Sequence, residues 1–282
     1  MTDLSRRAAL LAAMLTPIAA SACSRGQSQA SSGVDAPGEG PVVHDMSDMP
    51  ASWTQDNQIA MLCYPRMTIL DLIGPQYMFA SLMGATVHLV AKTRDPITSD
   101  TGVTIVPTAT FDETPSNLTV LFAPGGTDGT LAAMRDDETR NWVADRGSRA
   151  QYVTSVCTGS LILGAAGLLR GYNATCHWGG LSALSEFGAT PVDARIVKDR
   201  NRITGAGVTA GLDFGLQMLA ELRDRTYAEG VQLMCEYDPH PPFNAGSVHT
   251  APIHVRAMIQ AMVAPFPGQV REVAREIGVS AG

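Results

Sequence analysis

Cys157 stands where an apolar run meets a helix-like stretch, a position at which a cysteine can act as a nucleophile. Residues 152–156 read as a buried strand, and Cys157-Thr158-Gly159-Ser160 leads into the apolar residues 161–169. A sharp strand-to-helix turn of this kind, a nucleophile elbow, holds its side chain out over the edge of the sheet. The N-terminus of the following helix favours the thiolate, which is the reactive form of cysteine. The alternative interpretation is an inert core cysteine.

The rest of the chain supplies the elements that would position this cysteine. Short apolar runs predict strands at 59–64, 87–91, 118–122 and 152–156, and residues 103–106 resemble part of a hairpin. Helical spacing predicts helices at 70–82, 161–169, 209–222 and 227–237, and two short helices in the tail 253–277, broken near Pro265 and Pro267. The alternation of strands and helices predicts a mostly parallel α/β sheet with its site at the carboxyl ends of the strands.

Several motifs, taken in their order along the chain, resemble those of the ThiJ/PfpI superfamily, a class I glutamine amidotransferase-like group. Within this superfamily they resemble the isonitrile hydratases most closely. Besides the elbow, they are Thr68-Ile-Leu-Asp-Leu-Ile-Gly-Pro75, Ala123-Pro-Gly-Gly126, Thr175-Cys-His-Trp178 and the Pro-rich stretch 236–246. The resemblance implies a flavodoxin-like, mostly parallel sheet sandwiched by helices over residues 57–252. A C-terminal helical extension at 253–282 would follow.

Asp71 follows the first predicted strand and would lie at the same sheet edge as the elbow, where its carboxyl group can meet the sulfur of Cys157. A nearby thiolate would raise the carboxyl pKa, so that Asp71 could hold a proton near neutral pH and act as general acid and later as base. The amides of Gly125 and Gly126 could approach a substrate closely and stabilise an anion. The alternatives are a helix-capping aspartate and a plain tight turn.

Thr158 stands where the peptidase-like members of the superfamily carry a histidine, which argues against proteolysis. In the hydratase group a threonine here belongs to the site, where its hydroxyl can hold a water or the substrate; the alternative is a hydroxyl that caps the helix. His177, 20 residues after Cys157, falls where many members place a histidine near the cysteine. It could orient the thiolate or a water, or it could be an interior histidine satisfied by its neighbours.

The reaction that the resemblance implies is hydration of an isonitrile to an N-substituted formamide, catalysed by Cys157, Asp71 and Thr158. It requires no metal and no organic cofactor. The partner would be a small-molecule substrate, and members of the superfamily commonly form homodimers. Two alternatives stay open: a non-catalytic, small-molecule-binding envelope protein, and a cysteine-dependent enzyme that processes a carbonyl compound or an amide.

The composition of the chain argues against nucleic acid and a structural metal as binding partners. The 282 residues include 20 Lys and Arg against 27 Asp and Glu, and this net charge of -7 has the wrong sign for binding a nucleic-acid backbone. About 30 residues follow Pro252, too few for the DNA-binding region that AraC-type regulators append to the same domain. The five cysteines show no zinc-ligand spacing, so we expect no structural metal.

The N-terminus predicts export. Ser5-Arg6-Arg7 precedes an uncharged run at 8–20 and then Ser21-Ala22-Cys23, the layout of a twin-arginine signal peptide at 1–22 with a lipoprotein-like cleavage site. The run is shorter than the roughly 20 apolar residues that a transmembrane helix needs.

Cys23 would become the lipidated first residue of the exported chain and anchor it in the membrane. Residues 23–56 are rich in Ser, Gly and Pro, so they predict a disordered tether. The alternative is simple cleavage after Ala22, which would leave a soluble periplasmic protein.

Overall fold

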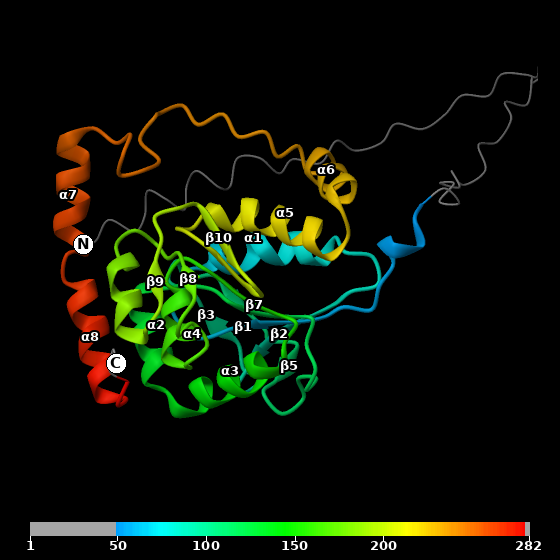
Figure 1. Cartoon of the computed structure of the whole chain (residues 1–282), viewed down its shortest axis with the longest axis horizontal. Helices are drawn as coiled ribbons and strands as arrows, with labels where there is room; N and C mark the ends of the chain where they lie inside the picture. The colour runs from blue at the N-terminus through cyan, green and yellow to red at the C-terminus, as the bar shows by residue number, and fades with distance from the viewer. Residues whose placement is uncertain (1–48, 280–282) are drawn as a thin grey trace, which may run out of the picture. The chain divides into compact units, whose positions relative to one another are not determined.

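The computed structural model describes residues 49–279, so the predicted signal peptide, Cys23 and most of the predicted tether lie outside the described residues. Its centre is a seven-stranded sheet with the order β10-β11-β7-β6-β1-β2-β5, in which β10 is antiparallel to β11 and the other neighbours pair in parallel (Figure 1). The strands are β1 (Gln58–Leu62), β2 (Thr86–Ala91), β5 (Ala109–Thr110), β6 (Val120–Ala123), β7 (Tyr152–Val156), β10 (Ile196–Asp199) and β11 (Arg202–Gly205). The order β2-β1-β6-β7-β11 is that of flavodoxin-like sheets, which confirms the predicted fold class.

Helices cover both faces of the sheet (Figure 1). On one face α1 (Ile69–Ala80) packs against α5 (Ala210–Leu222), and α5 packs against α6 (Arg225–Met234). On the other face lie α2 (Thr127–Arg135), α3 (Asp137–Arg149) and α4 (Gly159–Ala165). Because both faces are covered, β1, β6 and β7 are buried almost throughout, and their sequences are continuous apolar runs rather than alternating ones.

The register of the parallel strands brings three strand ends to one edge of the sheet. Met61 of β1 lies opposite Phe122 of β6, and Ala123, the last residue of β6, lies opposite Ser155 of β7. Because β6 lies between β1 and β7, the segments that leave these three strands emerge side by side. Those segments carry the predicted site residues, as expected for the carboxyl ends of parallel strands.

Two separate two-stranded sheets accompany this central sheet. The predicted hairpin is confirmed: β3 (Ile97–Thr98) and β4 (Thr104–Ile105) pair in an antiparallel manner. Two further short strands, β8 (Asn173–Ala174) and β9 (Thr190–Pro191), pair in parallel, and the 3-10 helix η2 (Leu181–Phe187) lies between them in the chain.

The two tail helices predicted from the sequence are present as α7 (Ile253–Val263) and α8 (Phe266–Glu276). The break falls at Ala264 and Pro265, whereas Pro267 lies in the first turn of α8, where a missing amide donor removes no helical hydrogen bond. Phe266, Val270 and Val273 of α8 are buried in the same core as the sheet. The segment that we treated as an extension therefore contributes to the folded body.

Residues 51–56, which we assigned to the end of the tether, also contact the body. The 3-10 helix η1 (Ala51–Trp53) places the Trp53 ring edge-on against Tyr227, with 5.1 Å between ring centroids. The indole Nε1 of Trp53 donates to Asp224 Oδ2 at 2.6 Å. Ordered contacts with the domain thus begin before residue 57. Within residues 49–279, none of the helices has the length and apolar character needed to cross a membrane.

Candidate active site

Cys157 follows β7 in a left-handed backbone conformation, with a φ of 54°. For a residue other than glycine this conformation costs roughly 1–2 kcal/mol, so the neighbouring structure must hold it. The Cys157 amide donates to the carbonyl oxygens of Gly205 and Ala206 at 3.1 and 2.9 Å, which ties the turn to the end of β11. A Cβ atom at Gly159 would lie 2.1 Å from the Ala123 carbonyl oxygen, so α4 can begin this close to β6 only with glycine there. The strand, sharp turn and helix of the predicted elbow are confirmed.

Asp71 lies in the first turn of α1 and is fully buried. Its Oδ2 accepts a hydrogen bond from the Gly125 amide at 3.0 Å, on the loop after β6, rather than capping its own helix. Its Oδ1 has no partner of standard hydrogen-bonding geometry among the described residues. A buried carboxyl oxygen without a partner is costly in a folded protein, so it is a group available to a bound molecule.

The pKa of Asp71 is raised to about 7 from its ordinary value of 3.8. Burial is the main cause, because it penalises the ionised carboxylate, and the negative charge of Asp100 adds to the increase in pKa. Hydrogen bonding by the Cys157 thiol and by the Gly125 amide opposes the increase. The predicted direction of the shift holds, but its main cause is desolvation rather than repulsion by a thiolate.

The pKa of the Cys157 thiol is also raised, well above its ordinary value. Burial contributes most, since only 5% of the residue is exposed, and the charges of Asp71 and Cys176 raise the pKa further. The Thr158 amide at the start of α4 lowers it, but by less than these effects raise it. The expectation of a thiolate favoured by the helix N-terminus is therefore wrong for this state: Cys157 is a thiol that faces a carboxyl group.

Gly125 and Gly126 lie beside the Asp71 carboxyl group and beside Thr158, the residue that precedes α4. A Cβ atom at Gly125 would lie 2.5 Å from the Thr158 amide nitrogen and 2.8 Å from Asp71 Oδ2, so the site closes around this position only when it is glycine. Gly126 has a φ of 153°, in the region that favours glycine, and its amide donates to Thr158 Oγ1 at 2.9 Å. Both amides are thus occupied by side chains of the site itself, which differs from the free anion-binding pocket that we expected.

The Thr158 hydroxyl belongs to this cluster and does not cap α4. Besides accepting from Gly126, its Oγ1 lies 2.8 Å from Thr130 Oγ1 on α2. The Tyr64 hydroxyl lies 3.3 Å from Thr130 Oγ1 and donates to the Pro124 carbonyl oxygen at 2.8 Å. Sequence analysis missed Tyr64 and Thr130, because a hydroxyl chain that joins three separate elements leaves no spacing signal in the sequence.

No hydrogen bond or charge interaction links His177 to Cys157 among the described residues, so its role in orienting the thiolate or a water stays a prediction, beside the alternative of an interior histidine. The Gly179 amide donates to His177 Nδ1 at 3.1 Å and the Gly180 amide donates to its carbonyl oxygen at 2.8 Å, so a tight turn fixes the orientation of the ring. Burial lowers the pKa of His177. The ring lines a separate cavity of about 460 Å³.

Residues 49–279 contain no group of three or more His, Cys, Asp or Glu side chains arranged to hold a metal ion. The four cysteines within this range are free thiols. The site is thus built from Cys157, Asp71, Thr158 and the two glycines of one loop, with Tyr64 and Thr130 behind them.

The sequence model of the DJ-1/PfpI family matches residues 57–221, which is more than half of the chain. The chain belongs to the DJ-1/PfpI family. This confirms the resemblance inferred from the motifs, and the matched range contains every residue of the site described above.

Among solved structures, the chain is similar to a ThiJ/PfpI family protein from Pseudomonas syringae, with 63% identity, a TM-score of 0.80, and coverage of 84% of this chain and 98% of that one. An isonitrile hydratase from Pseudomonas putida is 47% identical over 208 residues, which cover 74% of this chain and 90% of the hydratase. An HTH-type transcriptional regulator from Pseudomonas aeruginosa is 28% identical over 188 residues, and the match spans only 50% of that regulator. The relatives support an enzyme of this family.

Proposed function

We propose that this DJ-1/PfpI protein hydrates an isonitrile to an N-substituted formamide, with Cys157 as nucleophile. The identity of 47% with an isonitrile hydratase over most of that enzyme supports this reaction. The geometry supports it independently. Cys157 is only 5% exposed, and an isonitrile ends in a slim, linear N≡C group that can reach a nearly buried sulfur, whereas the planar carbonyl of an amide needs a wider approach.

In the first step the Cys157 thiol adds to the terminal carbon of the isonitrile. The ionised Asp71 carboxylate takes the thiol proton and passes it to that carbon as the S–C bond forms, which gives a thioimidate, Cys157–S–CH=N–R. Asp71 suits this transfer because its pKa of about 7 lets it both accept and release a proton near neutral pH.

In the second step water adds to the C=N bond. Asp71 and the Thr158 hydroxyl orient this water, the nitrogen takes up one proton, and the tetrahedral intermediate collapses with cleavage of the C–S bond. The products are the formamide R–NH–CHO and the regenerated thiol. The sum is one isonitrile plus one water, with no oxidant, reductant or further co-reactant.

A single observation carries this proposal: the buried carboxyl group of Asp71 faces the Cys157 thiol, with Oδ2 fixed by the Gly125 amide and Oδ1 without a hydrogen-bond partner of standard geometry among the described residues. A purely structural aspartate would have both oxygens satisfied. An acid that must exchange a proton with both a thiol and a substrate needs one oxygen left free.

The test is turnover of a panel of isonitriles, methylglyoxal and simple amides by the purified chain, beside Cys157→Ala, Asp71→Ala and Thr158→Val. Formamide production that is lost in the first two variants supports the hydratase. Equal turnover by Cys157→Ala excludes a covalent mechanism. Tight binding of isonitriles without turnover favours a small-molecule receptor instead.

We also propose that the chain is exported by twin-arginine transport and anchored through lipidated Cys23. Residues 1–48 lie outside the described structure, so the sequence pattern alone supports this. Replacing Arg6 and Arg7 with Lys should trap the precursor in the cytoplasm, and Cys23→Ser should release the protein from membranes. A precursor that is exported normally with both arginines replaced contradicts the twin-arginine route.

We further propose a homodimer. The helix α7 supports it, because it buries none of its residues and exposes Ile253, Met258 and Met262, as an apolar surface covered by a second copy would. Light scattering on the purified protein should give twice the mass of the chain. A monomer at all concentrations tested rejects the dimer.

A further inference from the structure

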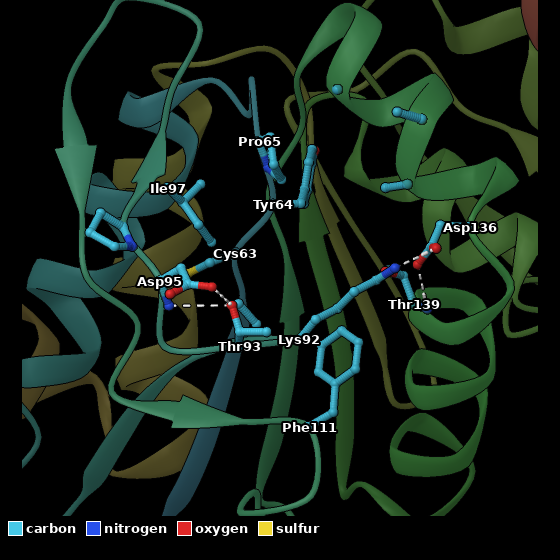
Figure 2. Close-up of a pocket in the computed structure, with 15 residues that line it drawn as sticks. Cys63, Tyr64, Pro65, Lys92, Thr93, Asp95, Ile97, Phe111, Asp136 and Thr139 are labelled. Carbon is cyan, nitrogen blue, oxygen red and sulfur yellow. Dashed lines mark hydrogen bonds and ion pairs between the residues drawn. The ribbon is translucent and has the colours of Figure 1, made fainter.

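A second cavity lies apart from the Cys157 site, between the carboxyl ends of β1 and β2 and the helix α2 (Figure 2). Its volume is about 540 Å³, within the range of small-molecule sites. Cys63, Tyr64, Ile97, Phe111 and Ala132 contribute to its walls. Neither Cys157 nor Asp71 lines it, so the proposed substrate does not account for this space.

The walls of this cavity indicate the kind of molecule that fits it. Most of them are apolar side chains, as Ile97 and Phe111 illustrate in Figure 2. The one cationic group, Lys92, reaches across to α3 and is neutralised by ion pairs with Asp136 and Glu138. An anionic ligand would have to break these pairs or remain unpaired, which is costly. The other carboxylate of the wall, Asp95, is exposed to solvent and accepts a hydrogen bond from the Thr93 hydroxyl, so it offers a cation little more than a solvated surface pair. An uncharged and mainly apolar molecule meets neither cost.

Tyr64 connects the cavity to the candidate active site. Its ring is part of the cavity wall, and its hydroxyl belongs to the chain that ends at Thr158. Because the single Tyr64 proton is donated to the Pro124 carbonyl, Tyr64 must accept from Thr130, and Thr130 must then accept from Thr158. The Thr158 hydroxyl therefore donates its proton to Thr130 Oγ1. One of its lone pairs accepts from the Gly126 amide, and the other can accept from a water.

We propose that this cavity is a second small-molecule site for an uncharged, mainly apolar ligand. A ligand bound there changes the hydrogen bonding of the Thr158 hydroxyl through Tyr64. A ligand that moves the Tyr64 hydroxyl away from Thr130 frees the Thr130 proton, which then points to Thr158. The proton of Thr158 turns outward, and the hydroxyl no longer accepts from the water. That the cavity binds a ligand does not depend on the proposed hydratase function, whereas the effect of the ligand on turnover rests on it.

Binding is tested by titration calorimetry of the full chain with cyclohexanol, beside cyclohexylammonium and cyclohexanecarboxylate as charged analogues of the same shape. Cyclohexanol should bind and both ions should bind at least about tenfold more weakly. Ala132 is an exposed residue of the cavity wall, so Ala132→Phe should fill the cavity and weaken cyclohexanol binding at least about tenfold. Ala132→Leu is the smaller substitution if the first variant folds poorly.

The matched control is Ala80→Phe, which makes the same change at the exposed last residue of α1, outside the cavity wall and outside the proposed dimer surface. It should leave cyclohexanol affinity unchanged. Absence of cyclohexanol binding, equal binding by the Ala132 variants, or equal binding of the charged analogues overturns the site.

Coupling is tested with isonitrile turnover at saturating cyclohexanol, which should lower kcat at least about twofold without changing KM. Tyr64→Phe keeps the ring as cavity wall but removes the hydroxyl, so it should retain cyclohexanol binding and lose the response of kcat. An unchanged kcat in the wild-type protein, or a response that survives in Tyr64→Phe, overturns the coupling. If the wild-type protein turns over no isonitrile, the proposed function fails, and the calorimetry still decides whether the cavity binds its ligand.

Discussion

The amide of Gly125 donates to Asp71 Oδ2 at 3.0 Å, so the loop after β6 fixes the direction in which the buried carboxyl group points. Gly125→Ala would place a methyl group 2.7 Å from Thr158 Oγ1 and 2.8 Å from Asp71 Oδ2. We expect this substitution to lower kcat/KM for isonitrile hydration by about 10²-fold or more and to destabilise the fold by about 1–3 kcal/mol. Steady-state kinetics and urea denaturation measure the two effects.

The control for this change is Gly230→Ala, in the helix α6, where an added Cβ meets nothing within 4 Å. It should leave kinetics unchanged and stabilise the helix slightly, because alanine has the higher helix propensity. Wild-type activity in Gly125→Ala would show that the loop does not orient Asp71.

The pH dependence of turnover follows from the proton that Asp71 and Cys157 share. The reactive arrangement carries one proton on the pair, because the carboxylate must be free to take the thiol proton. Below pH 7 both groups are protonated, so kcat/KM should rise about tenfold per pH unit up to pH 7 and then level off. Asp71→Asn should abolish this dependence and lower kcat/KM about 10²–10⁴-fold. A kcat/KM that instead falls above pH 7 contradicts the mechanism, because it would require a protonated Asp71.

The fold and most of the site could be predicted from the sequence because strands buried on both faces leave continuous apolar runs. The elbow at Cys157 and the acid at Asp71 each follow such a run, so their meeting at one sheet edge is a consequence of parallel topology. The helix α3 was missed because its composition is mostly polar and few of its residues are buried. The protonation of Cys157 was predicted wrongly because burial, which no local pattern shows, outweighs the helix N-terminus.

The raised pKa of Asp71 also predicts how stability depends on pH. The unfolded chain ionises this carboxyl group near pH 3.8 and the folded protein near pH 7, so folding is progressively penalised as the pH rises from about 4 to 7. Above pH 7 the full penalty is present, up to about 4 kcal/mol at about 1.4 kcal/mol per pKa unit. Asp71→Asn keeps an acceptor for the Gly125 amide and removes the charge. It should therefore raise Tm at pH 8 but not at pH 4, and equal effects at both pH values would refute the assignment.

The left-handed backbone of Cys157 provides a test of the elbow that is independent of catalysis. Cys157→Ala and Cys157→Gly both remove the thiol, but only alanine retains a Cβ atom at a φ of 54°. Because this conformation costs a residue with a Cβ roughly 1–2 kcal/mol and costs glycine little, the glycine variant should be the more stable one by about 1 kcal/mol, despite its larger entropy in the unfolded chain. Urea denaturation at one pH measures the difference. If Cys157→Ala is the more stable variant, the turn is not strained, and the hydrogen bonds from the Cys157 amide to Gly205 and Ala206 do not hold it against an opposing preference.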